Sequence, residues 1–243
     1  MILNDKTLFH IHTFRCGHAE NIPDETYIEK AVEIGASDIW FTDHAPFPGN
    51  PFRNRMTIEC LPEYISTLLA LKERYSSLLT VHIGIEIEYL PSFDKSGYYR
   101  YLTDNTEIEL LLLGQHMAEA SDVLPAYTFS WDKEKLKAEE FMALGEATIE
   151  GINTGYFGAV AHPDRIFRRC KSWTKPMEEI SKRIIDAARE KDIPIEQNQE
   201  SMHHKGHFRP EFWDIAKLCG VNIVQGLDAH KLQDIKIINV NHG

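Results

Sequence analysis

The most constraining feature of this 243-residue sequence is a regular alternation between short apolar runs and longer stretches with helical periodicity. Seven apolar runs predict buried strands, because parallel strands covered on both faces read as continuous apolar segments. They lie at residues 7–12, 38–43, 79–89, 110–116, 158–162, 193–198 and 221–230. Helices are expected at residues 24–35, 61–77, 132–150, 175–191 and 210–220. Strands that alternate with helices predict a parallel sheet of the α/β class.

Local signals support the helix boundaries and a single domain. Asp24 is expected to cap the first helix, Gly35 to end it, and Pro62 to lie in the first turn of the second. No linker rich in proline, glycine or serine divides the chain, so we expect one domain over residues 1–243. Seven repeats come close to the eight of a (β/α)8 barrel, which favours a barrel over an open sheet. The sequence alone leaves closure of the barrel open.

Composition bounds the function classes. The 43% of hydrophobic residues suffice for a core, and no run approaches the roughly 20 apolar residues of a membrane span. The start, MILNDKTLF, lacks the features of a signal peptide, so a cytoplasmic protein is expected. A net charge of −11 argues against binding to duplex nucleic acid. The four cysteines form no C-x-x-C pair and are expected to be buried thiols. The sequence gives no signal for the oligomeric state.

Side chains that can bind a metal or form hydrogen bonds follow the predicted strands, at the end where α/β folds place their active sites. They are His10 and His12, Asp43 and His44, Glu86 and Glu88, His116, His162 and Asp164, Glu196 and Asn198, and Asp228 and His230. In His-x-His both side chains point to one face, because a strand has a period of two. Imidazole and carboxylate together suit zinc, manganese or iron. Nine of the residues at or near strand ends are candidate ligands, too many for one tetrahedral zinc, and with a bridging carboxylate they suit three ions: His10, His12, His18, His44, His116, His162, His230, Glu86 and Asp228.

Some of these positions have alternative interpretations. Glu88 shares a face with Glu86 and could compete with it as a ligand, and His18 in its loop could equally be solvated. His82, inside a predicted strand, is expected to be structural. Asp164 could orient a metal ligand from behind.

Substrate contacts are expected from two segments. An arginine after the His-Pro-Asp turn could bind phosphate through its forked donors, and among Arg165, Arg168 and Arg169 we favour Arg168. At and after the sixth strand, Asn198, His204 and His207 are candidate substrate contacts.

The order His-x-His, His, Asp-His, Glu, His, His-Pro-Asp, Asp-x-His resembles the PHP (polymerase and histidinol phosphatase) domain, from Phe9 to about Lys231. Within that superfamily, HIHTFRCGHAE, FTDHAPFP, GIEIEYLP and LLLGQHM resemble the histidinol-phosphate phosphatase branch. The segment EQNQESMHHKGHFRP departs from the branch's pattern, and we expect this loop to face the leaving group.

The resemblance implies a distorted (β/α)7 barrel with a site for three divalent metal ions (zinc, manganese or iron). By this resemblance His10, His12 and Asp228 bind the first metal, and Glu86 bridges it to the second. His116 and His162 complete the second metal site. The third metal is held by three further histidines: His18, His44 and His230. The resemblance thereby favours Glu86 over Glu88 as a ligand.

The implied activity is hydrolysis of a small phosphate monoester, foremost L-histidinol phosphate to L-histidinol and phosphate in histidine biosynthesis. The expected mechanism is attack by a metal-bridging hydroxide, with Glu86, Asp228 and His230 as catalytic residues. Three alternatives stay open. The first is a phosphoesterase for nucleotides, oligonucleotides or phosphotyrosyl proteins, and the second is a non-catalytic metal-binding module. The third is an amidohydrolase, although His116 stands where that class usually has a lysine.

Overall fold

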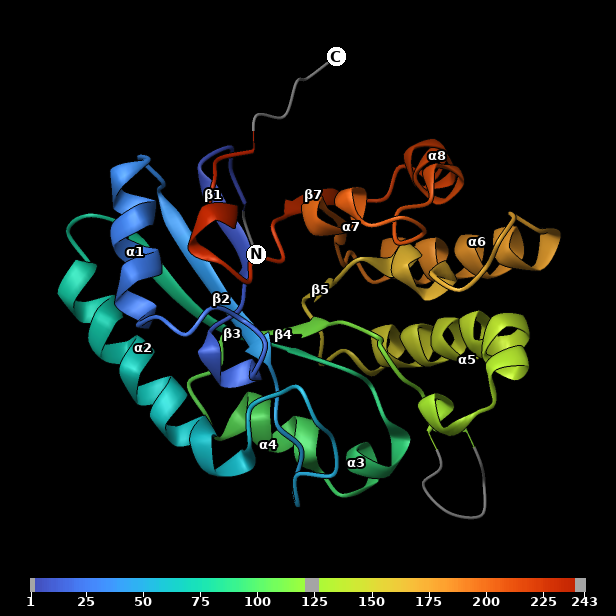
Figure 1. Ribbon diagram of the computed structural model, residues 1–243, viewed down its shortest axis with the longest axis horizontal. Coiled ribbons are helices and arrows are strands. Elements are labelled where there is room, and N and C mark those ends of the chain that lie inside the picture. The colour runs from blue at the N-terminus through green and yellow to red at the C-terminus, as the bar shows by residue number, and fades with distance from the viewer. Residues whose placement is uncertain (1–2, 121–126, 239–243) are drawn as a thin grey trace. The chain divides into compact units, whose positions relative to one another are not determined.

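A computed structural model describes residues 3–120 and 127–238 (Figure 1). All seven predicted strands are present, and they follow one another in the sheet in chain order. The strands are β1 (Thr7–Ile11), β2 (Asp38–His44), β3 (Thr80–Ile87), β4 (Leu110–Leu113), β5 (Ala159–Val160), β6 (Ile195–Asn198) and β7 (Ile223–Gly226). The pairs β1–β2, β2–β3, β4–β5 and β5–β6 are parallel, as alternation with helices predicts.

The five predicted helices are present, together with three that periodicity did not predict. The α-helices are α1 (Asp24–Glu33), α2 (Leu61–Tyr75), α3 (Pro91–Lys95), α4 (Tyr98–Asp104), α5 (Lys133–Thr154), α6 (Lys175–Glu190), α7 (Gln199–His203) and α8 (Pro210–Cys219). Short 3-10 helices are η1 (Phe14–Cys16), η2 (Ile58–Cys60), η3 (Thr128–Ser130), η4 (Pro163–Phe167) and η5 (Leu232–Asp234). The unpredicted α3, α4 and α7 have five, seven and five residues, too few for an apolar period to emerge.

Several strands end before the side chains that were predicted to lie on them. β4 ends at Leu113, β5 at Val160 and β7 at Gly226. His162 and Asp228 follow these ends with φ of 30° and 54°, in the left-handed region. Both residues leave the extended backbone conformation after their strands have ended, so the predicted strands at 158–162 and 221–230 were too long.

By its internal contacts, the described chain divides into two compact units. The first comprises residues 3–86, 107–110 and 225–238. Within it β2 pairs with β3 in register from Asp38 opposite Thr80 to His44 opposite Glu86. Apolar side chains of the two strands are fully buried, and α1 and α2 lie beside these strands (Figure 1). The register therefore brings one predicted imidazole and one predicted carboxylate ligand side by side.

The boundaries of α1 partly follow the sequence signals. Pro23, not Asp24, is the N-cap residue, so the predicted cap is wrong. Asp24 is the first helical residue, and both its carboxylate oxygens accept hydrogen bonds from Nη1 of Arg15, at 2.9 and 2.8 Å. Gly35 adopts a φ of 75° just after the C-cap residue Ile34, which confirms the predicted end of the helix. Pro62 lies in the first turn of α2 as predicted.

The second unit comprises residues 87–106, 111–120 and 127–224. Here α5 packs against α6, and α6 against α8 (Figure 1). A Cβ atom at Gly145 of α5 would lie 2.4 Å from Cγ1 of Ile180 on α6. Glycine therefore permits the close approach of these two helices.

Two expectations from composition can be compared with the described residues. All four cysteines are free thiols, but only Cys16 is buried; Cys60, Cys170 and Cys219 are partly exposed, so their predicted burial is wrong. None of the helices within residues 3–120 and 127–238 combines the length and apolar character that crossing a membrane requires.

Candidate metal centre

Seven of the nine predicted metal ligands gather within the first unit. They are His10, His12, His18, His44, Glu86, Asp228 and His230. The imidazoles of His10 and His12 face each other, with their Nε2 atoms 3.0 Å apart. Oε2 of Glu86 lies 3.5 Å from Nε2 of His10 and 3.6 Å from that of His12. Oδ1 of Asp228 lies 3.1 Å from Nε2 of His12, so two carboxylates and two imidazoles converge.

The backbone at His10 is irregular. The pairing of β1 with β2 shifts register between Leu8 and Ile11, and His10 has a φ of 71°. The prediction that His10 and His12 converge is confirmed, but a regular strand period is not the whole reason. Non-glycine residues with positive φ are strained, and such strain concentrates at functional sites. His10 and Asp228 both carry it, and their side chains approach to 3.6 Å.

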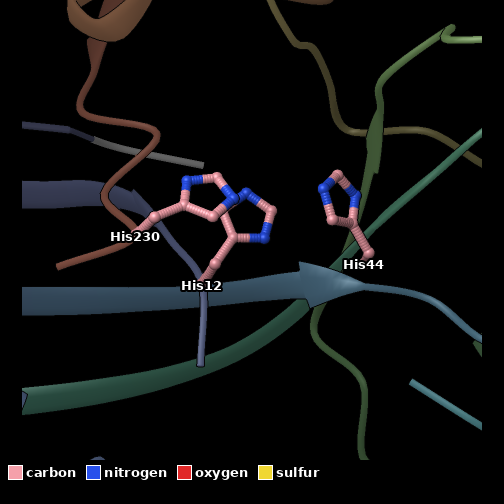
Figure 2. A group of neighbouring side chains, drawn as sticks. All are labelled: His12, His44 and His230. Atoms are coloured by element: carbon pink, nitrogen blue, oxygen red, sulfur yellow. The ribbon is translucent and has the colours of Figure 1, made fainter. Parts of the chain in front are cut away.

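A second imidazole group lies beside the first. The ring of His230 stacks on that of His12 at 4.2 Å, and the ring of His44 lies 4.4 Å from that of His12. Figure 2 shows His44 rising from the end of β2, with His12 and His230 packed together beside it. Nδ1 of His44 also lies 3.0 Å from Oε2 of Glu86. Glu86 thus approaches the imidazoles of three different histidines.

His18 lies beside this group, and its role as a metal ligand stays a prediction. Its Nε2 lies 3.0 Å from Nε2 of His230. Nδ1 of His18 contacts the carbonyl oxygen of Cys16 at 3.1 Å, and Nδ1 of His230 contacts that of Asp228 at 2.9 Å. A carbonyl accepts a hydrogen, so both rings carry it on Nδ1 and present bare Nε2 lone pairs to each other. Two facing lone pairs repel unless a cation attracts both.

The donor set fits divalent transition metals. In each of several triplets, such as His12–His44–His230 and His10–His12–Glu86, the ligand atoms all lie within 4.8 Å of one another. Imidazole nitrogen and carboxylate oxygen are ligands of zinc, manganese and iron alike. Burial raises the pKa of the nearby Cys16 thiol to about 12, with Asp43 adding to the effect. The thiol therefore stays protonated, as befits a packing residue.

Charges within the group shift the pKa values of two histidines in opposite directions. Burial lowers the pKa of His12, but its contacts with Asp228 and Asp43 outweigh burial and raise the value to about 9. Burial and the neighbouring His12 lower the pKa of His230 to about 3. A metal that binds His12 must therefore displace a proton, whereas His230 is neutral and ready to bind.

The second unit holds the two other predicted ligands, His116 and His162, with ring centroids 5.1 Å apart. Nδ1 of His116 contacts Oε1 of the buried Glu88 at 3.1 Å. Oε2 of Glu196 accepts a hydrogen bond from the backbone N–H of His162 at 3.1 Å. Glu88 is thus the orienting partner of a histidine, and Glu196 holds the strained backbone of another.

We expect Glu88→Gln to weaken zinc binding about 10-fold, because carboxylates that orient ligating histidines contribute 10- to 100-fold to metal affinity. The amide oxygen can still accept from His116, so the lower end is expected. Glu109→Gln is a matched control, since Oε2 of Glu109 contacts Nδ1 of His82 at 2.9 Å outside the metal group. Competition with a chelator measures both affinities. Equal affinities of the two variants would contradict the orienting role of Glu88.

The predicted substrate contacts lie in the second unit. Nη2 of Arg168 contacts Oε1 of the buried Glu140 at 3.1 Å and the carbonyl oxygen of His116 at 3.3 Å. Nε2 of the exposed His204 contacts Oε1 of Glu200 at 2.6 Å, and its ring lies 5.4 Å from that of His207. The predicted loop at 199–209 begins instead with the helix α7.

Asn198, the remaining predicted contact, is fully buried at the end of β6. Its Oδ1 accepts hydrogen bonds from the backbone N–H of Ser201 and from Nη2 of Arg165, at 2.8 and 3.1 Å. Arg165 also donates to Oγ of Ser201 through Nε and Nη2. Asn198 and Arg165 therefore anchor α7 to the His-Pro-Asp turn, a coupling for which the sequence carries no local signal.

Asp164 connects the His-Pro-Asp turn to the start of α8. Its Oδ2 accepts hydrogen bonds from the backbone N–H of Arg209 at 2.8 Å and from Nε1 of Trp213 at 2.9 Å. Both partners precede or lie in α8. These contacts make Asp164 an anchor for that segment, and its role behind a metal ligand stays a prediction.

Burial raises the pKa of Asp164 from 3.8 to about 6, outweighing the two hydrogen bonds. Between these values the folded protein binds a proton that the unfolded chain has released, so stability falls as the pH rises through this window. The loss is on the order of 3 kcal/mol. We expect the unfolding free energy of Asp164→Asn, relative to the wild type, to rise by this amount from pH 4 to pH 7. Urea unfolding at both pH values measures it, and a difference independent of pH would contradict the assignment.

Comparison with known proteins places the chain in a family. The family model described as "PHP domain" matches residues 9–200. A protein named "Probable histidinol-phosphatase" from Deinococcus radiodurans is 39% identical over 89 residues, which span 35% of this chain and 33% of that protein. The "Histidinol-phosphatase" of Bacillus subtilis is 24% identical over 257 aligned positions, covering 93% of this chain and 94% of the relative.

Two crystal structures share the fold. The structure of hisK from Listeria monocytogenes has a TM-score of 0.74 at 18% identity and covers 98% of both chains. A histidinol phosphate phosphatase from Lactococcus lactis, complexed with zinc, L-histidinol and phosphate, has a TM-score of 0.69 at 20% identity, covering 94% of this chain and 87% of that one. These likenesses confirm the predicted distorted (β/α)7 barrel of the PHP type. With the family model matching most of its length, the chain belongs to the PHP domain family.

Proposed function

We propose that this protein is a metal-dependent phosphomonoesterase that hydrolyses L-histidinol phosphate to L-histidinol and phosphate. The observation that carries the proposal is the convergence of five imidazoles and two carboxylates in the first unit. Two relatives are named as histidinol-phosphatases, and a zinc-containing structural neighbour holds L-histidinol and phosphate. The net charge of −11 favours a small substrate over duplex nucleic acid. The proposed place of action is the cytoplasm.

We propose three divalent metal ions, with zinc the first candidate because of the Lactococcus structure. The proposed ligands are the nine predicted from the family pattern: His10, His12, His18, His44, Glu86, His116, His162, Asp228 and His230. When bound, such ions make hydroxide available near neutral pH and stabilise the negative charge that develops on a phosphoryl group. The predicted catalytic roles of Glu86, Asp228 and His230 remain part of this proposal.

The chain's own residues supply positioning and charge. Glu86 and Asp228 place two buried negative charges among the imidazoles, of which His10 and His12 are also buried, and these charges favour the binding of cations. The carbonyl oxygens of Cys16 and Asp228 fix the hydrogen of His18 and His230 on Nδ1. Arg168 is the proposed phosphate contact, and Asn198, His204 and His207 are the proposed contacts to the rest of the substrate. Glu140 holds Arg168 in place for this role.

The test is phosphate release by the zinc-loaded protein from a panel of esters. The panel contains L-histidinol phosphate, p-nitrophenyl phosphate, a mononucleotide, bis(p-nitrophenyl) phosphate and a carboxamide. We expect kcat/KM for L-histidinol phosphate to exceed that for the aryl monoester by about 100-fold, since the site then binds the amine and imidazole as well. A higher kcat/KM for the diester or the nucleotide would contradict L-histidinol phosphate as the substrate. Hydrolysis of the carboxamide would contradict phosphate ester hydrolysis as the reaction.

A further inference from the structure

One arginine of the first unit is buried among acidic partners close to the metal group. The side chain of Arg15, in η1, is only 3% exposed. Nη1 donates to both carboxylate oxygens of Asp24, the first residue of α1. Nε and Nη2 donate to the carboxylate of Glu63 in the first turn of α2, at 2.8 and 3.0 Å. The guanidinium is therefore fixed by two helices rather than left to solvent.

The same guanidinium reaches the end of β1. Nη1 of Arg15 also donates to Oγ1 of Thr13 at 3.1 Å, and the backbone N–H of Arg15 lies 3.4 Å from that oxygen. A hydroxyl has one hydrogen to donate, and that of Thr13 points to Oδ2 of Asp43 in a short contact. Thr13 and Asp43 are both fully buried. Arg15 thus fixes the hydroxyl, and the hydroxyl fixes the carboxylate.

Asp43 stands behind His12. Its Oδ1 accepts a hydrogen bond from the backbone N–H of His44 at 3.0 Å and lies 3.6 Å from Nδ1 of His12. That Nδ1 is buried and has no hydrogen-bond partner among the described residues. The other ring nitrogen, Nε2, faces Asp228 and Glu86. A carboxylate behind Nδ1 favours a hydrogen there and leaves the Nε2 lone pair for a metal.

We propose that Arg15, Thr13 and Asp43 form a positioning relay for His12. Each member orients the next by a hydrogen bond or a charge, and the last one sets the ring orientation and the tautomer of the histidine. The inference rests on the proposed metal centre and adds three residues that do not themselves bind metal. It predicts that the buried hydroxyl of Thr13 contributes to metal affinity.

The experiment measures the zinc affinity of metal-depleted protein by competition with a chromophoric chelator. Thr13→Val removes the hydroxyl at nearly constant volume, and we expect it to weaken zinc binding about 10- to 100-fold. Thr13→Ser retains the hydroxyl and should stay within about 3-fold of the wild type by the same reasoning. Thr42→Val is the matched control, because the buried Thr42 hydroxyl has no hydrogen-bond partner within the described part of the chain. It should leave zinc affinity unchanged.

A double-mutant cycle with His12→Ala tests whether Thr13→Val changes zinc affinity through His12. Once the imidazole is removed, Thr13→Val should have little further effect on zinc affinity, because the relay acts through His12. If Thr13→Val does not fold, Arg15→Lys takes its place as the test variant. It keeps the positive charge but loses the forked donors of the guanidinium, and it should also weaken zinc binding.

The relay is overturned if Thr13→Val binds zinc as tightly as Thr42→Val, or if Thr13→Ser is weakened as much as Thr13→Val. Undiminished effects in the His12→Ala background would equally contradict it. These outcomes differ from failure of the proposed function, in which the zinc-loaded wild type would release no phosphate from any ester. Zinc affinity can be measured in either case.

Discussion

Replacing Glu86 with glutamine is expected to lower kcat/KM for phosphate release by at least about 1000-fold, or roughly 4 kcal/mol in transition-state stabilisation. The reason is the position of its Oε2, which lies within 3.6 Å of nitrogens of His10, His12 and His44. Glutamine keeps the shape but removes a negative charge from among three imidazoles that are proposed metal ligands. Metal content should therefore fall together with activity.

Elemental analysis and phosphate release on the same preparation measure this effect. Glu59→Gln is the control, because Glu59 is a surface carboxylate that accepts a hydrogen bond from Asn50. It should match the wild type in both measurements. Three metals per chain together with normal turnover in Glu86→Gln would show that Glu86 does not bind metal.

Replacing Glu140 with alanine is expected to cost about 3 kcal/mol of unfolding free energy, because a buried carboxylate loses two hydrogen bonds from charged guanidinium groups. Glu140 is 1% exposed and accepts hydrogen bonds from Nη2 of Arg168 and Nε of Arg169, at 3.1 and 2.6 Å. For a chain of this size the loss corresponds to a fall of roughly 10 °C in Tm. Since Arg168 also contacts the carbonyl oxygen of His116, activity should fall as well.

Glu139→Ala provides the comparison on the same helix. Glu139 is exposed, and its carboxylate lies 3.9 Å from Nζ of Lys135, so its loss should change stability by less than about 1 kcal/mol. Thermal unfolding of both variants and the wild type measures the difference in Tm. Similar Tm values would contradict a stabilising role of the hydrogen bonds between Glu140 and the two arginines.

The element order and class of the fold were predictable because they depend on periodicity. A buried parallel strand such as β4 is a continuous apolar run, and α6 has a clear apolar stripe. The short helices α3, α4 and α7 were not predicted, because one or two turns give no period. Strand ends were overextended at His162 and Asp228, because positive φ values depend on tertiary contacts such as that of Glu196 with the His162 N–H.

The proposed metal ligands were predictable where they follow the ends of strands. His82 was also predicted to be structural, and it contacts Glu109 and stacks on Trp40. The orienting carboxylates were harder to identify, since Glu88 and Asp43 resemble ligands in sequence and only their partners distinguish them. The burial of Glu140 was predictable from helical spacing, because it lies four positions before the buried Leu144 and therefore on the inner face of α5.

The most direct test of the account is a zinc titration of the metal-free protein in which bound metal and phosphate release from L-histidinol phosphate are measured together. The contacts of His12 with Asp228 and Asp43 raise its pKa to about 9, so zinc binding there would release a proton and the titration needs a well-buffered pH. The account predicts no turnover without metal and a rise in turnover with occupancy, up to three zinc ions per chain. Full turnover without metal, or saturation with zinc without phosphate release, would contradict it.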